Sequence, residues 1–406
     1  MKKTHYGWFV CFGCALLLFC TSGLTVNAFT VYQPYILRLN AFSNAQSSNI
    51  IMVRSLFSFL AMIFAGKYYK IFSLRLGIAI AGALTVLGFF SFGMSTTYLA
   101  YCFSAALIGL SFGLGTMIPV AIVLEHWFIS KRNFAIGICS AFTGLSTLGI
   151  PSALTWLIET HGLRKAFLTE TACIAVLLTI SVLLIKDAPA KMGMEPYGFQ
   201  PKATERAHAE PAAKETLSNK QWILIVFMLI ALGPMMSVGY SHLSVLISAE
   251  GFNPQLTALS ITISGVMMTI GKFLFGWMSD RIGTYKCNWI FGSVMVLGLV
   301  LCCTMGGSVL VLILAMCCYG GGLATTSIGL TAWAGDLSTP EQYDENIRRF
   351  QLGYAAGTLL FSSLPGALAD RFGGSYIPAY IFFVGCAIFV LLSVQWLYRK
   401  TGQHKN

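Results

Sequence analysis

Charged residues are scarce in this chain of 406 residues, where they make up 10% of the sequence against about a quarter in an ordinary soluble domain. The sequence also lacks a cluster of metal ligands, a nucleophile elbow and a phosphate-binding loop, so we expect neither an enzyme nor a metal or cofactor site. Hydrophobic residues, in contrast, make up 56%. Apolar runs of about 20 residues, long enough to cross a bilayer, recur along nearly the whole chain. Lipid is therefore the expected solvent.

Cysteine is frequent, with 12 residues, but most of them lie inside apolar stretches, which argues against a disulfide framework. We interpret the Cys11/Cys14 pair as helix packing. The formal net charge of +11 would suggest nucleic acid in a soluble protein. Here the positions of the basic residues have a simpler cause in membrane orientation, so we expect no nucleic-acid partner.

Apolar length, interrupted by charged or turn-rich segments, predicts twelve membrane-spanning helices. The first is read as a retained helix rather than a cleaved signal peptide. The predicted ranges are 8–30, 48–66, 76–94, 98–124, 134–157, 166–185, 222–247, 256–276, 288–305, 308–333, 349–368 and 377–398.

The distribution of Lys and Arg predicts the orientation. With a cytoplasmic N-terminus, 20 basic residues fall on the inside and four on the outside, so we expect both termini in the cytoplasm of a multi-pass cell-membrane protein. The polar stretch from Lys186 to Gln221 separates two groups of six helices. We therefore expect bundles at 1–186 and 222–406, joined by a partly disordered cytoplasmic linker at 187–221.

Similar short segments recur about 210 residues apart, as an ancient duplication would leave them. The pairs are Gly66–Lys70 with Gly276–Asp280, Glu159–Gly162 with Asp370–Gly373, and Gly113–Gly115 with Gly320–Gly322, at offsets of 210, 211 and 207 residues. The expected fold is an all-α membrane protein of two six-helix pseudo-repeats with a central path between them.

The segment Gly276-Trp-Met-Ser-Asp280-Arg281-Ile-Gly283, in the predicted cytoplasmic turn after helix 8, resembles the Gly-x-x-x-Asp-Arg-x-Gly signature of the major facilitator superfamily. The resemblance implies the fold of that superfamily. Asp280 and Arg281 would form charge-assisted contacts that break as the two halves rock. The corresponding place in the first half reads Gly66-Lys-Tyr-Tyr-Lys70, so a latch there is expected to be weaker or different.

A second group of motifs spans both halves of the chain. It comprises Tyr6-Gly7-Trp8, Trp127-Phe128-Ile-Ser-Lys131-Arg132 with Ala135-Ile-Gly137, Gly162-Leu163-Arg164-Lys-Ala166-Phe167, Met192–Gly198 and Asp370–Tyr376. Together these resemble the monocarboxylate transporters and the bacterial oxalate/formate antiporters, with Leu163 in place of the usual Trp. The resemblance implies transport of small organic carboxylates.

Lys272 lies four residues before Gly276, where the oxalate-type members carry a basic residue, so the resemblance implies an anion anchor there. The second basic residue of those members, in helix 11, is replaced by Ala356, and the helix 8 Asp of the monocarboxylate transporters is replaced by Met268. One cation favours monocarboxylates over oxalate. Alternatively, the Lys272 side chain extends toward the cytoplasm. Since a buried Lys can lose its proton, Lys272 is also a candidate proton carrier.

Further polar residues fall inside the apolar helices, where a charge costs from about 2.5 kcal/mol upward and usually faces a cavity or a partner. Arg54 in helix 2 either attracts anions at the entrance or pairs with Glu170 in helix 6. His242 is a candidate gate that titrates near neutrality, although a lone His more often serves packing. Asn27 and Gln33 in helix 1 are candidate hydrogen-bond donors to a carboxylate, whereas Tyr240 and Tyr354 either line the path or serve packing.

The leading hypothesis is a secondary active transporter of small organic anions, most of all monocarboxylates, that works by alternating access. Its expected partners are the anion, protons or a counter-anion, and the lipid bilayer, and we expect a monomer. One alternative is an exporter of amphipathic or drug-like compounds, which the abundance of Met and Phe would suit. Another is a membrane sensor that keeps the fold and transports nothing.

Overall fold

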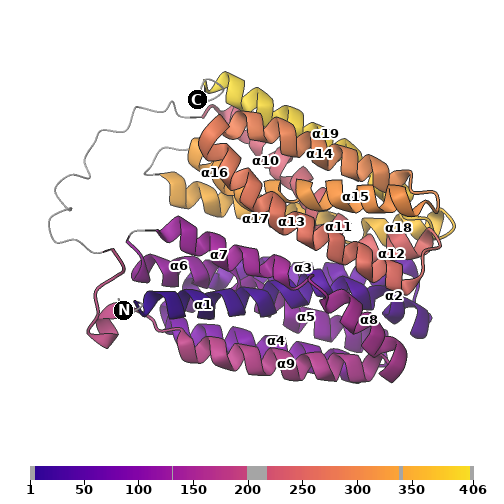
Figure 1. The fold of residues 1–406 in the computed structure, drawn as a ribbon, viewed down its shortest axis with the longest axis horizontal. Coiled ribbons are helices and arrows are strands. Elements are labelled where there is room, and N and C mark those ends of the chain that lie inside the picture. Colours follow the sequence, from indigo (N-terminus) through magenta and orange to yellow (C-terminus); the bar gives the residue numbers. More distant parts are fainter. Residues whose placement is uncertain (1–4, 130, 199–216, 338–341, 403–406) are drawn as a thin grey trace. The chain divides into compact units, whose positions relative to one another are not determined.

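The computed structural model describes residues 5–129, 131–198, 217–337 and 342–402 (Figure 1). The described part of the chain is helical apart from loops and one isolated backbone bridge. The elements up to the central linker are α1 (Gly7–Leu18), η1 (Phe19–Asn27), η2 (Ala28–Val31), α2 (Tyr32–Leu39), α3 (Asn44–Ile71), α4 (Leu74–Met94), α5 (Tyr98–Gly115), α6 (Met117–Trp127), α7 (Arg132–Leu145), α8 (Ile150–His161), α9 (Leu163–Leu184) and η3 (Pro189–Met192).

The second half of the chain repeats this alternation of long helices and short breaks. Its elements are α10 (Asn219–Gly233), η4 (Pro234–Val238), α11 (Gly239–Ser241), α12 (Leu243–Ala249), α13 (Pro254–Ile282), α14 (Thr284–Cys303), α15 (Val309–Gly322), η5 (Thr325–Gly329), α16 (Leu330–Asp336), α17 (Tyr343–Phe361), α18 (Leu364–Arg371) and α19 (Ile377–Lys400).

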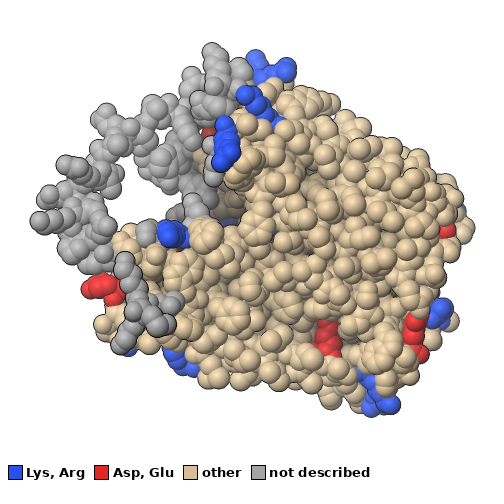
Figure 2. Space-filling model, viewed as in Figure 1, with Lys and Arg blue, Asp and Glu red and all other residues tan. Residues whose placement is uncertain are grey.

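Eleven helical stretches in the described residues are long and apolar enough to cross a membrane. The remaining predicted span, 308–333, consists of the shorter apolar helix α15 followed by η5 and α16. On the face drawn in Figure 2, charged side chains lie toward the ends of the helices and a broad uncharged band lies between them. The prediction of an all-α, multi-pass membrane protein is confirmed.

Contacts divide the chain into two compact units. Unit 1 comprises residues 1–29, 56–146 and 157–210, and unit 2 comprises residues 30–55, 147–156 and 211–406. Unit 2 thus contains the last six predicted helices together with two segments, 30–55 and 147–156, from the first six. The division into bundles at 1–186 and 222–406 stays a prediction from the sequence.

The first, fourth, seventh and tenth predicted helices are all interrupted near their middle. A π-helix interrupts the first at η1, the seventh at η4 and the tenth at η5, while the fourth bends between α5 and α6 at Thr116, where φ is −106° and ψ is −126°. The bend at residue 116 and the start of η5 at residue 325 lie 209 residues apart. This offset falls inside the range that the sequence repeat predicts. π-helical turns are rare and often occur at functional sites.

Glycine allows the fourth and tenth helices to approach their neighbours closely. A Cβ added at Gly113 would collide with the Ser58 carbonyl oxygen and Ala61, and one added at Gly320 would collide with the backbone of Ser264. Small residues at such crossings are the usual means by which membrane helices pack, since lipid supplies no hydrophobic drive between helices. The glycine-rich centres at Gly113 and Gly320, which the sequence repeat makes equivalent, therefore have the same packing role in their two units.

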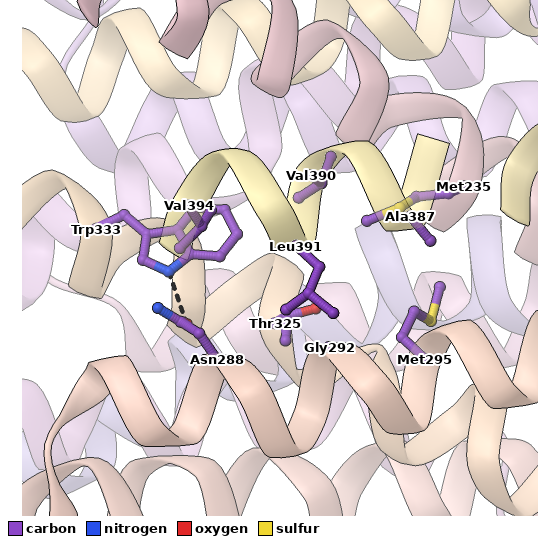
Figure 3. A pocket seen from close by; sticks show the side chains of 10 residues that line it. All are labelled: Met235, Asn288, Gly292, Met295, Thr325, Trp333, Ala387, Val390, Leu391 and Val394. Carbon is purple, nitrogen blue, oxygen red and sulfur yellow. Dashed lines mark hydrogen bonds between the residues drawn. The ribbon is translucent and has the colours of Figure 1, made fainter. Parts of the chain in front are cut away.

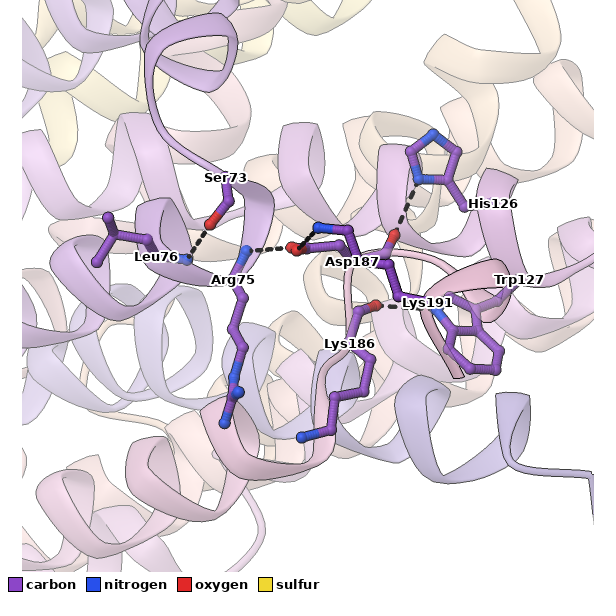
Figure 4. A network of polar contacts seen from close by, with 8 residues as sticks. All are labelled: Ser73, Arg75, Leu76, His126, Trp127, Lys186, Asp187 and Lys191. Carbon is purple, nitrogen blue, oxygen red and sulfur yellow. Dashed lines mark hydrogen bonds and ion pairs between the residues drawn. The ribbon is translucent and has the colours of Figure 1, made fainter. Parts of the chain in front are cut away.

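The start of the central linker is docked onto unit 1, in what we call the linker clasp, made of residues 5–8, 73–76, 126–129 and 186–197. Figure 4 shows its polar part. The Trp127 indole Nε1 donates to the Lys186 carbonyl oxygen at 2.9 Å, and His126 Nδ1 lies 3.0 Å from the Asp187 carbonyl oxygen. The Asp187 carboxylate accepts from the Arg75 amide at 2.8 Å and from Lys191 Nζ at 2.7 Å.

Further along the linker, Tyr197 completes the clasp. Its amide donates to the Trp127 carbonyl oxygen at 2.8 Å and its carbonyl oxygen accepts from the Ile129 amide at 3.0 Å. The Tyr197 ring packs against the rings of Trp8 and Phe128, with centroids 5.6 Å away in each case. Three separate motifs that resemble the carboxylate transporters, at Tyr6–Trp8, Trp127–Phe128 and Met192–Gly198, thus meet in one place. The remainder of the linker, 199–216, lies outside the described residues.

Candidate functional site

The seventh predicted helix is the most irregular part of unit 2. It runs as α10, passes through the π-helix η4 to the single turn α11, and restarts after His242 as α12. Two tyrosine hydroxyls bind its carbonyl oxygens: Tyr319 donates to Met235 at 3.0 Å and Tyr380 donates to Gly239 at 2.6 Å. These bonds satisfy backbone groups around the break and hold the irregular turn in place.

Arg54 projects from α3 toward this break. Its side chain is only 8% exposed, and Nη2 donates to the Ser241 hydroxyl oxygen at 3.3 Å. Tyr354 of α17 lies close enough to interact electrostatically with the guanidinium group. Because arginine keeps its proton even in apolar surroundings, Arg54 provides a permanent positive charge at this point of unit 2.

His242 is fully buried at the break itself. Its Nδ1 lies 2.9 Å from the Val238 carbonyl oxygen and its Nε2 lies 2.8 Å from the Ser48 hydroxyl oxygen. Since a carbonyl oxygen can only accept, Nδ1 carries a proton, and in the neutral ring Nε2 accepts from Ser48. The histidine therefore joins the seventh helix to α3, and protonation of Nε2 would reverse the direction of the Ser48 bond.

Three side chains beside this break carry buried polar atoms that find no hydrogen-bond partner in the described part of the chain; we call them the orphan group. They are Gln33 through both amide atoms, Tyr240 through its hydroxyl and Ser264 through Oγ, and the side chains are 3%, 4% and 0% exposed. Leaving one buried polar group unsatisfied costs about 1–3 kcal/mol. The orphan group therefore marks a place in unit 2 where a ligand or water would gain hydrogen bonds.

A line of hydrogen bonds, which we call the seam, ties segment 30–55 to the second half of the chain within unit 2. The Asp370 carboxylate accepts from the Asn44 amide at 3.1 Å and the Ala45 amide at 2.9 Å, at the N-terminus of α3. Ser362 donates to Ser55 at 3.1 Å. A carboxylate at a helix N-terminus is favoured both by the free amides and by the helix dipole. The seam lies near the helix ends that, from the distribution of Lys and Arg, are predicted to face the outside of the cell.

The structure brings together five of the residues that the sequence singled out: Gln33, Arg54, Tyr240, His242 and Tyr354 all lie in unit 2 around the broken helix. Glu170 is 5% exposed and belongs to unit 1, so its pairing with Arg54 stays a prediction. The side chains of Asn27 and Asp280 lie outside what the structure describes.

Two basic residues lie further along α13 in the same unit. Lys272 is half-buried and comes eight residues after Ser264, about 12 Å along the helix axis. Arg281 is exposed and its guanidinium carbon lies 4.1 Å from the centroid of the Trp277 ring. This stacking holds the Arg281 side chain against its own helix by a cation–π contact.

Sequence reasoning missed Ser264, Ser241, Ser48 and the role of Asp370. The serines give no pattern that separates them from the many other serines in apolar helices. Asp370 was noted only as part of a repeat and a family motif, although an acidic residue at the end of one helix can bind the free N-terminus of another.

A separate small cavity lies in unit 2 between α14, α16 and α19 (Figure 3). It measures about 20 Å³, which is room for one water molecule. Trp333 Nε1 donates to Asn288 Oδ1 at 2.9 Å at one end, and the other lining groups are mainly apolar. This cavity is too small for an organic substrate. Within the described residues, no three His, Cys, Asp or Glu side chains gather as a metal site would need.

Comparison with known proteins places this geometry in context. The sequence profile of the Major Facilitator Superfamily matches residues 14–347 and 243–406. The chain is 25% identical to the probable transporter MCH2 of Saccharomyces cerevisiae over 74% of its own length and 62% of that protein. It is 24% identical to monocarboxylate transporter 12 of Rattus norvegicus over 73% of its own length and 66% of that protein. In both cases the chain spans less than two thirds of the relative.

Among solved structures, a D-xylose–proton symporter superposes with a TM-score of 0.74 over 97% of this chain and 96% of that one, at 13% sequence identity. An identity this low shows a shared fold and carries no information on the substrate.

Proposed function

Because the chain belongs to the Major Facilitator Superfamily and is a secondary transporter rather than an enzyme, we propose that its substrate is a small organic anion, most of all a monocarboxylate, moved by alternating access. The observation that carries this proposal is Arg54, a permanent cation held in unit 2 beside the orphan group. A carboxylate there would gain both a positive charge and hydrogen-bond donors that the protein alone leaves unused. The name of the rat relative, a monocarboxylate transporter, supports the same class.

In the proposed mechanism, Arg54 and Gln33 receive the carboxylate near the broken seventh helix, and Lys272 anchors it further along α13. Broken helices are the usual substrate sites of secondary transporters, since their freed backbone and facing side chains line the path. The seam and the His242–Ser48 bond close this side of the path. Opening it would require those bonds to break together as segment 30–55 leaves the second half, while Asp280 and Arg281 act at the opposite ends of the helices.

Counterflow in proteoliposomes tests the substrate class. Vesicles loaded with unlabelled lactate, pyruvate, formate, acetate or oxalate would be assayed for accumulation of labelled lactate. We expect exchange with the monocarboxylates and weaker exchange with oxalate, because Ala356 offers a second carboxylate no cation beside Lys272, and Arg54 receives the anion at a different point of the path. Exchange with none of these acids, together with increased drug sensitivity of a deletion strain, would contradict the proposal and favour an exporter of amphipathic compounds.

Two variants of Lys272 separate anchoring from coupling. Lys272→Ala should weaken binding of the anion. Lys272→Arg should retain binding and exchange but lose proton-driven accumulation. The reason is that lysine, unlike arginine, can release its proton in a water-poor site. Proton-driven accumulation that survives in Lys272→Arg would exclude lysine as the proton carrier. Normal binding by Lys272→Ala would leave Arg54 as the anchor.

The orientation of the protein can be tested separately. Both termini and the linker are proposed to face the cytoplasm, on the basis of the asymmetry in Lys and Arg. A reporter fused after Asn406 should be active only inside the cell, and activity only outside would invert the topology.

A further inference from the structure

Two members of the orphan group, both in the second half of the chain, lie close to one another. Tyr240 lies on α11, and its hydroxyl is close enough to the hydroxyl of Ser264 on α13 for the two groups to interact. In the described structure neither oxygen reaches hydrogen-bonding geometry with the other or with any other group. Each of these two buried hydroxyls can both donate and accept, so each keeps hydrogen-bonding capacity that a ligand could use.

The backbone on both sides of this pair is fixed. A Cβ added at Gly239, next to Tyr240, would come within 2.7 Å of the Tyr319 hydroxyl oxygen, so this turn rests directly against α15. Gly320 of α15 in turn packs on the backbone of Ser264. The two hydroxyls are thus held by close helix contacts rather than carried on mobile loops, as a preorganised binding site requires.

The pair also belongs to the same polar cluster as Arg54. Tyr319 interacts electrostatically with both Tyr240 and Tyr354, and Tyr354 interacts with Arg54. These interactions place the cation and the hydroxyl pair in the same part of unit 2. A ligand whose negative end lies at Arg54 has these hydroxyls within the same cluster.

We propose that the Tyr240–Ser264 pair is a specificity subsite, which binds a neutral oxygen atom of the transported anion. The preferred substrate then carries a hydroxyl or carbonyl oxygen in addition to its carboxylate, and simple unsubstituted acids bind less tightly. This inference rests on the proposed function, since it assigns a second contact to the same anion. Nothing in the sequence motifs points to Ser264, because it belongs to none of them.

The physical reason for selectivity is the state of the two hydroxyls when the substrate lacks a matching oxygen. An apolar methyl or methylene group placed against them leaves both buried and unsatisfied, whereas a hydroxyl or carbonyl oxygen satisfies at least one. Sites of this kind discriminate against the analogue that lacks the polar group more strongly than they discriminate by size. We expect a difference of about five- to tenfold for a single neutral hydrogen bond.

The test uses acids that differ in one oxygen atom. Propionate, lactate and 3-hydroxypropionate would compete with labelled pyruvate for binding to the purified full-length transporter in nanodiscs. In the wild type, at least one of the two hydroxy acids should compete about five- to tenfold better than propionate. Ser264→Ala and Tyr240→Phe should each reduce that ratio toward one while propionate itself competes as before.

Ser260→Ala is the matched control. Ser260 lies one turn earlier on α13 and is also fully buried, but its hydroxyl donates to the Leu256 carbonyl oxygen at 2.7 Å. Its removal should leave the ratio unchanged. Equal competition by all three acids in the wild type, or an unchanged ratio in both subsite variants, would overturn the inference and leave water as the partner of the pair. Failure of every acid to compete would instead overturn the proposed function.

Discussion

The linker clasp and the broken seventh helix are both polar regions of a mostly apolar protein, yet they differ in how their polar groups are used. In the clasp, the Trp127 indole, the Asp187 carboxylate and the Tyr197 backbone each make the hydrogen bonds that Figure 4 and the backbone bridge record. Around the broken helix, the Gln33 amide and the Tyr240 and Ser264 hydroxyls are buried without hydrogen-bond partners in the described structure. Satisfied groups stabilise a fold, whereas unsatisfied ones cost stability and are kept where a ligand completes them.

The largest effect on transport is expected when one basic residue in each region is replaced by glutamine. Arg54→Gln removes the permanent charge beside the orphan group and should reduce transport about 100-fold or more, as loss of a buried charged contact does. Arg75→Gln in the clasp removes a side chain whose Nε donates to the Val182 carbonyl oxygen at 3.0 Å. It should leave the substrate affinity unchanged. Transport rates would be compared at equal abundance of folded protein in proteoliposomes.

A wild-type rate for Arg54→Gln would show that the guanidinium group serves structure alone. The comparison between the two regions would then fail, because the buried cation of the broken helix would behave like the one in the clasp.

The next effect concerns the helix crossing that positions the broken segment. A Cβ added at Gly357 of α17 would collide with the backbone of Ile230 in α10, about one turn before the π-helix. Gly357→Ala should lower the free energy of unfolding by about 1–3 kcal/mol through overpacking and should also impair transport. Thermal unfolding in detergent and transport assays would measure both.

Gly385→Ala on α19 is the matched control, because an added Cβ there meets nothing within 4 Å. It should keep the wild-type unfolding temperature. A tolerated Gly357→Ala would mean that α10 and α17 separate without cost and that the position of the broken helix is not fixed by this crossing.

Opposite signs of stability change are expected when one polar group is removed from each region. Gln33→Met replaces two unsatisfied amide atoms with a side chain of similar length and should raise the free energy of unfolding by about 1 kcal/mol while it weakens transport. Trp127→Phe deletes the donor to the Lys186 carbonyl oxygen and should lower the free energy of unfolding by about 1 kcal/mol. Its substrate preference should stay unchanged. Destabilisation by Gln33→Met would show that its amide has structural partners.

Some features of the fold and of the candidate site can be predicted from the sequence, and others cannot. The length of the apolar runs was enough to predict the membrane-spanning segments, since the thickness of the bilayer sets the length of a spanning helix. The repeat offsets anticipated equivalent positions in the two halves, and the break at Thr116 and the start of η5 fall within their range. Arg54 and Gln33 stood out because polar residues in apolar helices are rare enough to be conspicuous.

Other features depended on contacts that no single segment encodes. The π-helix η4 and the turn after it accept hydrogen bonds from the distant Tyr319 and Tyr380 hydroxyls, and local helix propensity carries no signal for this break. Ser264 becomes distinctive only once Tyr240 faces it. The docking of Tyr197 places the start of a segment that reads as a flexible linker onto unit 1. In each case the deciding partner lies far away in the chain.

The smallest expected effect tests the clasp through its charge. Burial alone would raise the pKa of the Asp187 carboxyl, but hydrogen bonds from Lys191 and the Arg75 amide, together with both positive charges, outweigh burial and hold the pKa below its ordinary value of 3.8. A carboxyl whose pKa is depressed by folding adds stability above the unfolded pKa, and this contribution is lost as the pH falls through the folded pKa. Because the Lys191 side chain is 67% exposed, solvent screening keeps the contribution of this pair within about 0.2–1 kcal/mol.

Asp187→Asn should therefore lower the unfolding temperature slightly at pH 7, and the difference from the wild type should shrink as the pH falls from 3.8 through the depressed folded pKa, where the Asp187 carboxyl becomes neutral. Glu250→Gln, which removes one negative charge outside the clasp, provides the control for net charge. High salt should reduce the pH 7 difference, because the Lys191 pair is screened. If the difference between Asp187→Asn and the wild type stayed the same from pH 7 to pH 3, the carboxylate charge would have no part in the clasp, and its stability would rest on the Trp127 and Tyr197 bonds alone.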